Sequence, residues 1–204
     1  MIGCRIVVAV WLAIGSATAW QGAPGSNMTQ AERTELVELL QKAEQEFLQA
    51  VDGLTDEQWS FKPGPDRWSV GEVAEHIVLA DEMLFDGAAR MLDGQPDPKW
   101  EETLRKTEIL RNALPNRSRK VDAPGAIQPK HVMTRAQVLA RFKEQRARAT
   151  AFARATDAPL KSYTSRNPFF GLLNAHQWLI YIPLHHLRHN QQIAEVKASP
   201  GYPR

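Results

Sequence analysis

Apolar residues recur along this chain mostly at intervals of three and four, the spacing that predicts amphipathic helices. The first such stretch runs from about residue 29 to 52, with an apolar stripe from Leu36 to Val51. Thr29 and Glu32 form the Thr-x-x-Glu pattern of a capping box, which indicates where the helix begins. Because a stripe of this kind must be buried, this helix needs partners to pack against.

A second helix is predicted from about residue 70 to 92. Ser69 and Glu72 provide its capping box. The preceding residues 58–68 contain two prolines and a glycine, so we expect a turn region there. The apolar side of this second helix carries His76, an unusual residue among valine, isoleucine and alanine.

Residues 95–133 are the least regular part, with a polar helix near 99–110 followed by three prolines. A connection this long suits a crossover that lets the second and third long helices run parallel. We predict a third helix over 135–155 and a fourth over about 170–197. Strand-like alternation is scarce, so the pattern predicts an all-α protein, a single four-helix bundle with extra short elements.

The first residues have the three regions of a secretory signal peptide. Arg5 precedes an apolar run over residues 6–14, and Ala17-Thr18-Ala19 offers small residues for cleavage. The apolar run is shorter than the roughly 20 residues of a membrane span. We therefore predict a signal peptide over 1–19 and export to the periplasm or the extracellular space, with an uncleaved N-terminal anchor as the alternative.

Composition narrows the chemistry of the remaining chain, which we divide into a flexible segment over 20–28 and one domain over 29–204. The single cysteine of the whole sequence, Cys4, lies in the predicted signal peptide, so disulfides and thiolate metal sites are excluded from the domain. The formal net charge is only +2. A nucleic-acid surface would need a clustered basic field, and we expect no nucleic-acid partner.

Three of the six histidines lie within the stretch LHHLRHNQQI, residues 184–193. His185 and His189 are four residues apart, so both rings project from one helix face, about 5–6 Å apart at Cβ. That spacing lets two imidazoles bind one metal at about 2.0–2.1 Å each. His76 adds a third ligand on a different helix, and three protein ligands with an open position are typical of a catalytic metal site.

Each of these side chains also has an ordinary structural interpretation. His76 is alternatively a core histidine bonded to a backbone carbonyl or to Glu72, while Glu72 either orients His76 or only caps its helix. Trp68 either walls the site or packs ahead of the cap. Gln192 follows the histidine pair on the same side and either contacts a bound water or fills the bundle. His186 is rotated by about 100° from its neighbour, so we expect it to face another helix or solvent.

Two stretches resemble the DinB-like proteins, a superfamily of helical bundles. WSVGEVAEH, residues 68–76, resembles the opening of that family's second helix, and residues 167–197 resemble its last helix, where His-x-x-x-His precedes Gln-Ile. The resemblance spans about residues 30–203. It implies an up-up-down-down four-helix bundle with a long crossover between helices two and three. It also implies a divalent metal, zinc or nickel, held by three histidines, which in this chain are His76, His185 and His189.

The resemblance also implies a range of activities. Characterised relatives include transferases and isomerases that use the cytosolic thiols mycothiol or bacillithiol, so export of this chain would make hydrolysis the competing reaction. We expect an exported divalent-metal-dependent enzyme, of hydrolase or thiol-transferase type, that acts on a small molecule and has no stable membrane span after cleavage.

Two other classes of protein fit the same residues. One is a non-catalytic periplasmic bundle that binds a metal or a small ligand. The other is a structural bundle whose histidines are core residues. Bundles of this family often pair, which leaves a homodimer open.

Overall fold

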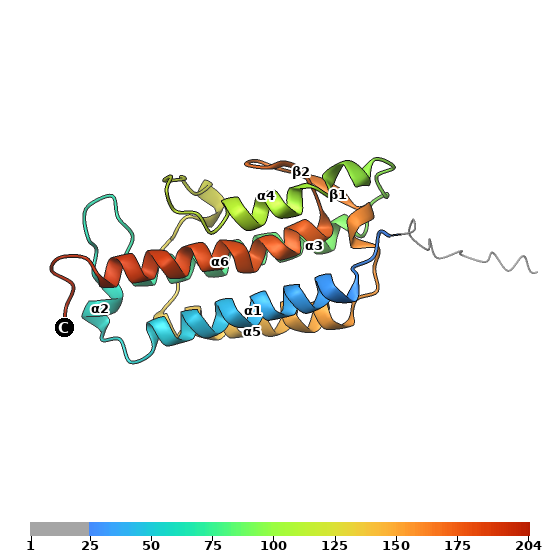
Figure 1. Cartoon of the computed structure of the whole chain (residues 1–204). Coiled ribbons are helices and arrows are strands. Elements are labelled where there is room, and N and C mark those ends of the chain that lie inside the picture. The colour runs from blue at the N-terminus through green and yellow to red at the C-terminus, as the bar shows by residue number, and fades with distance from the viewer. Residues whose placement is uncertain (1–24) are drawn as a thin grey trace, which may run out of the picture.

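Four long helices form the bundle in the computed structural model, which describes residues 25–204 (Figure 1). The predicted signal peptide over 1–19 lies outside the described residues. The long helices match the predicted all-α class and three of the four predicted ranges closely. They are α1 (Gln30–Val51), α3 (Val70–Met91), α5 (Arg135–Ala155) and α6 (Ala175–Lys197).

Each long helix begins at a side chain that satisfies its first free backbone N–H groups. The N-caps are Thr29, Ser69, Thr134 and Asn174, and each forms a reciprocal capping box with the residue three positions later. The two capping boxes predicted from the sequence, at Thr29 and Ser69, are confirmed. Because caps of this kind each stabilise a helix by about 1 kcal/mol, the chain fixes these four start points locally.

Contacts between helix ends give the direction of α1 and α5. Arg33, at the start of α1, donates to the carbonyl oxygens of Ala153 and Thr156 at the end of α5. Arg135, at the start of α5, donates to the carbonyl oxygen of Leu54 just after α1. The two helices are therefore antiparallel.

The other two long helices complete the order. Asp81 and Asp86 of α3 pair with Arg146 and Arg148 of α5 in the same sequence direction, so α3 and α5 are parallel. The start of α3 lies beside the end of α6, which makes those two antiparallel. The order is up-down-down-up. The predicted crossover between parallel helices is present, whereas the up-up-down-down order is not confirmed, because the turn after α1 leads α3 straight back.

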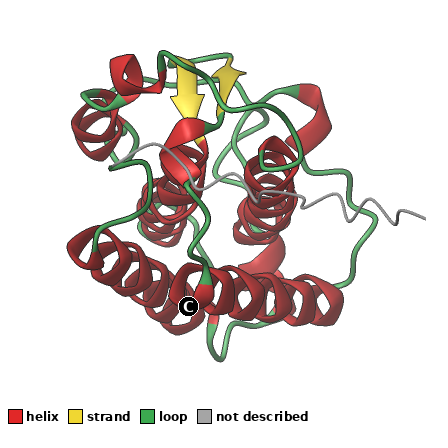
Figure 2. Cartoon of the chain, turned by 90° about the vertical axis from the view of Figure 1, so that its right-hand side faces the viewer, coloured by secondary structure: helices red, strands yellow, loops and turns green. Residues whose placement is uncertain are grey.

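The connections contain short elements that the hydrophobic pattern did not resolve. The polar helix expected over 99–110 is two pieces, η1 (Trp100–Thr103) and α4 (Lys106–Ala113). The fourth long helix begins at 175 rather than near 170, because β2 (Gly171–Asn174) pairs with β1 (Thr164–Asn167) in an antiparallel hairpin. Figure 2 shows this hairpin at one edge of the bundle. The remaining short helices are α2 (Asp56–Ser60), η2 (Gly125–Ile127) and η3 (Leu160–Ser162).

The N-terminal end of the described chain is tied to the rest of the bundle. Ser26 is fully buried, and its carbonyl oxygen accepts from the backbone N–H of Lys161. Ser26 therefore contacts η3, while the domain boundary at residue 29 stays a prediction. Among residues 25–204 no helix is long and apolar enough to cross a membrane.

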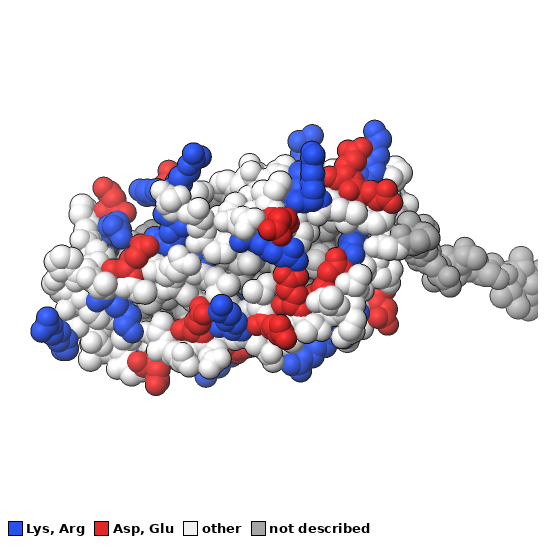
Figure 3. Space-filling model, viewed as in Figure 1, with Lys and Arg blue, Asp and Glu red and all other residues white. Residues whose placement is uncertain are grey.

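The charged side chains are well mixed on the face shown in Figure 3, where blue and red groups alternate over the helices. Over the whole described molecule many charged side chains pair between helices, as Arg141 of α5 does with Glu82 of α3 and Arg111 of α4 with Glu35 of α1. Exposed pairs of this kind each contribute at most about 1 kcal/mol. The positions of the long helices therefore depend mainly on the buried apolar residues between them.

Candidate metal centre

Three histidines from two helices converge inside the bundle. Nε2 of His76, on α3, lies 3.1 Å from Nε2 of His189 on α6, and the latter lies 3.0 Å from Nε2 of His185. Three ligand nitrogens that share one tetrahedral zinc ion would lie about 3.3 Å from one another, given Zn–N bonds of about 2.0–2.1 Å. The nitrogens of this cluster, all within 4.8 Å of one another, already have nearly that arrangement.

The tautomer of His76 is set by the backbone. Its Nδ1 lies 2.7 Å from the carbonyl oxygen of Ile127, in η2. A carbonyl oxygen only accepts, so Nδ1 carries the hydrogen and donates it. Nε2 of His76 is therefore unprotonated, with its lone pair directed into the cluster.

The tautomer of His189 is set by a side chain. Its Nδ1 lies 2.8 Å from Oε1 of Gln192, one turn further along α6. Arg117 donates to the same Oε1 at 3.3 Å, and because a guanidinium only donates, this contact identifies the atom as the amide oxygen. Nδ1 of His189 must then be the donor, so its Nε2 also presents a lone pair.

Two lone pairs that face each other across 3.1 Å repel unless a cation lies between them. The outer contacts of His76 and His189 thus prepare both rings as ligands, in the manner of histidines whose second nitrogen is held by a carbonyl or an amide. This donor set suits a divalent metal such as zinc or nickel.

Burial favours the neutral form of all three rings. It lowers the pKa of His76, and together with the neighbouring rings it holds the pKa of His185 and His189 well below the usual value. His76 and His189 are buried, whereas His185 keeps part of its surface exposed. Neutral imidazoles are the form that binds a metal.

Aromatic rings wall the cluster on two sides. The ring of Trp68 lies 4.9 Å from that of His76, and the ring of Tyr181 lies 5.8 Å from that of His185, measured between centroids. Burial raises the pKa of Tyr181 to about 12, so its hydroxyl stays protonated. Of the predicted neighbours, Trp68 and Gln192 both lie against the histidines.

For Glu72 the sequence left two roles open, orienting His76 or capping its helix, and the structure shows the cap. Its two carboxylate oxygens accept from the backbone N–H of Ser69 and from Lys62, and His131 lies 3.3 Å away. Glu72 is occupied by the capping box because the cap needs its carboxylate at the backbone, one turn before His76. The outer partner of His76 is instead the backbone carbonyl that the sequence offered as an alternative.

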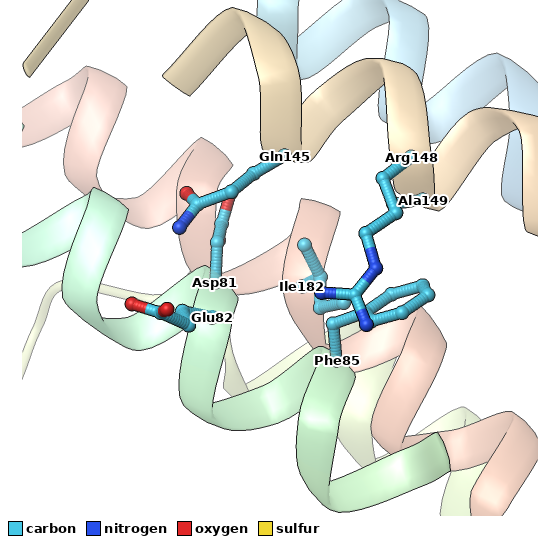
Figure 4. Close-up of a pocket in the computed structure, with 7 residues that line it drawn as sticks. All are labelled: Asp81, Glu82, Phe85, Gln145, Arg148, Ala149 and Ile182. Atoms are coloured by element: carbon cyan, nitrogen blue, oxygen red, sulfur yellow. The ribbon is translucent and has the colours of Figure 1, made fainter. Parts of the chain in front are cut away.

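His186, on α6, belongs to a separate buried network that joins α3, α5 and α6. Nη2 of Arg146 lies 2.8 Å from Oδ2 of Asp81 and 2.7 Å from Nδ1 of His186, and all three side chains are buried. Burial raises the pKa of Asp81 to about 6. A hollow of about 10 Å³, room for about one water, lies beside Asp81 and Gln145 (Figure 4).

Two residues at the cluster carried no signal in the sequence. The Ile127 carbonyl is a backbone group, which any residue could supply, and only the fold brings it to His76. Arg117 sits in a proline-rich connection among other basic residues, where nothing distinguishes it. A sequence pattern can reveal side chains that recur at regular spacing. The contacts of Ile127 with His76 and of Arg117 with Gln192 do not depend on such spacing.

Comparisons with known proteins agree with this architecture. YuaE of Bacillus subtilis (strain 168), an uncharacterized protein, is 26% identical over 163 residues, which cover 78% of this chain and 95% of YuaE. The structure of YfiT from Bacillus subtilis aligns with a TM-score of 0.53 and 17% identity over 89% of this chain and 95% of YfiT. YfiT is described as a probable metal-dependent hydrolase with an unusual four-helix bundle topology. At this identity the likeness shows the fold alone, and it confirms the predicted four-helix bundle.

A sequence model of the DinB superfamily matches residues 39–193. This range covers most of the chain and contains all three histidines of the cluster. It also contains the crossover between α3 and α5 and the residues that fix the two tautomers. The chain therefore belongs to the DinB superfamily.

Proposed function

We propose that this protein is a divalent-metal-dependent enzyme whose metal is held by His76, His185 and His189. One observation carries the proposal: two buried ring nitrogens face each other with lone pairs, because Ile127 and Gln192 hold the opposite nitrogens as donors. Zinc and nickel are the metals that we favour. A bound metal of this kind supplies Lewis acidity, which polarises a substrate oxygen and lowers the pKa of a coordinated water.

Hydrolysis of a small molecule is the reaction we favour. Three histidines leave further coordination positions on a divalent metal, which a water or a substrate could occupy. The description of YfiT as a probable metal-dependent hydrolase supports this class of reaction. Thiol transfer is the runner-up, and a cytosolic location would favour it.

The metal is tested by elemental analysis of the untagged protein purified without chelators. We expect about one transition-metal ion per chain in the wild type and almost none in the His185→Ala/His189→Ala variant. His131→Asn is the matched control, because His131 is largely exposed and its positive φ suits asparagine. Wild-type protein that stays metal-free after incubation with zinc or nickel would overturn the proposal.

Catalysis is tested separately on the metal-loaded protein. Panels of esters, amides and lactones are compared with thiol-transfer assays, and the double histidine variant serves as the blank. Turnover of a hydrolytic substrate that is lost in the variant supports a hydrolase. Stoichiometric metal without turnover in either panel would favour the non-catalytic binding protein.

We also propose that the chain is exported, on the basis of the signal-peptide pattern in residues 1–19. N-terminal sequencing of protein recovered from a periplasmic fraction is expected to begin after Ala19. Recovery of the intact N-terminus from the cytosol would contradict export and would favour thiol transfer over hydrolysis.

A further inference from the structure

The long connection between α4 and α5 contacts both helices that carry the histidines. We call residues 114–134 the connecting strap. One of its carbonyl groups, from Ile127, accepts from His76 of α3, and one of its side chains, Arg117, donates to Gln192 of α6. A single segment therefore supplies an outer contact to ligands on two different helices.

Arg117 is the most connected side chain of the strap. Its Nε and Nη2 each lie 2.7 Å from an oxygen of Glu195, and its Nη1 donates to Oε1 of Gln192. This fork holds the Gln192 amide with its oxygen toward His189. If the guanidinium were removed, the amide could turn its NH₂ group toward the ring, and Nδ1 of His189 would become the acceptor. The hydrogen would then move to Nε2, where it would block metal binding.

The strap has few other anchors. Arg188 of α6 donates to the carbonyl oxygens of Asn116 and Arg119, and the backbone N–H of His131 donates to Glu75. The His131 ring also contacts Glu72, and Met133 packs, partly buried, against the core. Among its apolar side chains Leu114 and Ile127 are buried, whereas Val121 and Val132 are more than half exposed. A segment with so little buried apolar surface is expected to open locally at low free-energy cost.

We propose that Arg117 is a positioning residue for the metal ligands and that docking of the strap is coupled to metal binding. The proposal rests on the function proposed above. The docked strap selects the tautomers that bind metal, and a bound metal in turn holds those tautomers and their partners in the strap. Such coupling is reciprocal: the factor by which strap docking raises the metal affinity equals the factor by which bound metal raises the equilibrium constant of docking.

The first test compares Arg117→Met with Arg119→Met. Arg119 is exposed on the same strap and contributes its carbonyl group rather than its side chain to the anchor. Zinc affinity is measured by competition with a chromophoric chelator. Hydrogen exchange of strap peptides is measured with and without zinc. We expect zinc to slow exchange in the strap of the wild type, and we expect Arg117→Met to lose about 10–100-fold in affinity. Arg119→Met should match the wild type in both.

The second test needs no metal. In protein labelled with ¹⁵N-histidine, ring nitrogen shifts should give the Nδ1–H tautomer of His189 in the wild type and a mixture in Arg117→Met. A general loss of stability would not change this ratio in the folded protein. Zinc that binds without any change in strap exchange, or an unchanged tautomer in Arg117→Met, would overturn the inference. Failure of the wild type to bind any metal would instead overturn the proposed function.

Discussion

Acid should destabilise the metal-free protein through His176, a buried histidine on α6 away from the metal centre. The side chain is 1% exposed, and burial lowers its pKa to about 4 from an ordinary 6.5, although Glu32 acts in the opposite direction. The folded state therefore binds the proton more weakly than the unfolded state does. The resulting stability is complete above pH 6.5 and is lost as the pH falls toward 4.

The size of the effect follows from the two pKa values. At pH 5 the unfolded-state imidazole is almost fully protonated and the folded-state imidazole is almost fully neutral. The difference lowers the free energy of unfolding by about 2 kcal/mol relative to pH 8. This contribution comes from His176 alone and adds to those of the other buried histidines.

The His176→Leu variant isolates this contribution. Urea unfolding is followed by circular dichroism with EDTA present, for wild type and variant, at pH 8 and pH 5. At pH 8 the difference in the free energy of unfolding between variant and wild type measures the altered contacts alone. At pH 5 we expect this difference to shift by about 2 kcal/mol in favour of the variant. A difference between the two proteins that stays the same at both pH values would refute the reasoning.

Two further pairs of variants test the core by urea unfolding. Arg146→Met removes one partner of a buried ion pair and should lower the free energy of unfolding by about 3 kcal/mol or more. Arg148→Met, in a more exposed pair on the same helix, should lower it by less than about 1 kcal/mol. Equal losses would contradict the role of burial. A Cβ at Gly71 would lie 2.3 Å from the indole nitrogen of Trp59, so Gly71→Ala should destabilise by about 1–3 kcal/mol. Gly87→Ala meets only ordinary contacts in a helix interior and should stabilise by about 0.5–1 kcal/mol; destabilisation by both would show that lost backbone freedom is not the deciding effect at Gly87.

Much of the fold could be predicted from the sequence because helix starts are local. Thr29 and Ser69 each lie three residues before a glutamate, and those boxes locate the first two long helices without reference to the rest of the chain. The hairpin of β1 and β2 could not be predicted in this way, because strand pairing is not a local property. Its strands have four residues each, too few to display alternation, and they are stable only because they pair with each other beside α4.

In the candidate site, too, local spacing could be predicted from the sequence, whereas contacts between distant segments could not. The spacing of His185 and His189 within one helix predicts their proximity, and the structure also brings His76 to them. The directions of the helices, the partner of His76 and the role of Arg117 depend on which segments meet after folding. Glu72 shows the limit of inferring a contact from helical spacing. Its position one turn from His76 suggested a contact, whereas its carboxylate is bound in the capping box.

The distance in sequence between the ligands has a consequence for biosynthesis. His76 and His189 are separated by 113 residues in sequence. The crossover and one long helix, α5, lie between the two helices that carry them. A nascent chain cannot present a complete ligand set until α6 has been made and has docked, so the complete site cannot acquire the ion before that stage. If the chain crosses a membrane unfolded, that acquisition takes place in the destination compartment. The metal found in the protein would then reflect which ions are available where the fold closes, as well as which ions three imidazoles prefer.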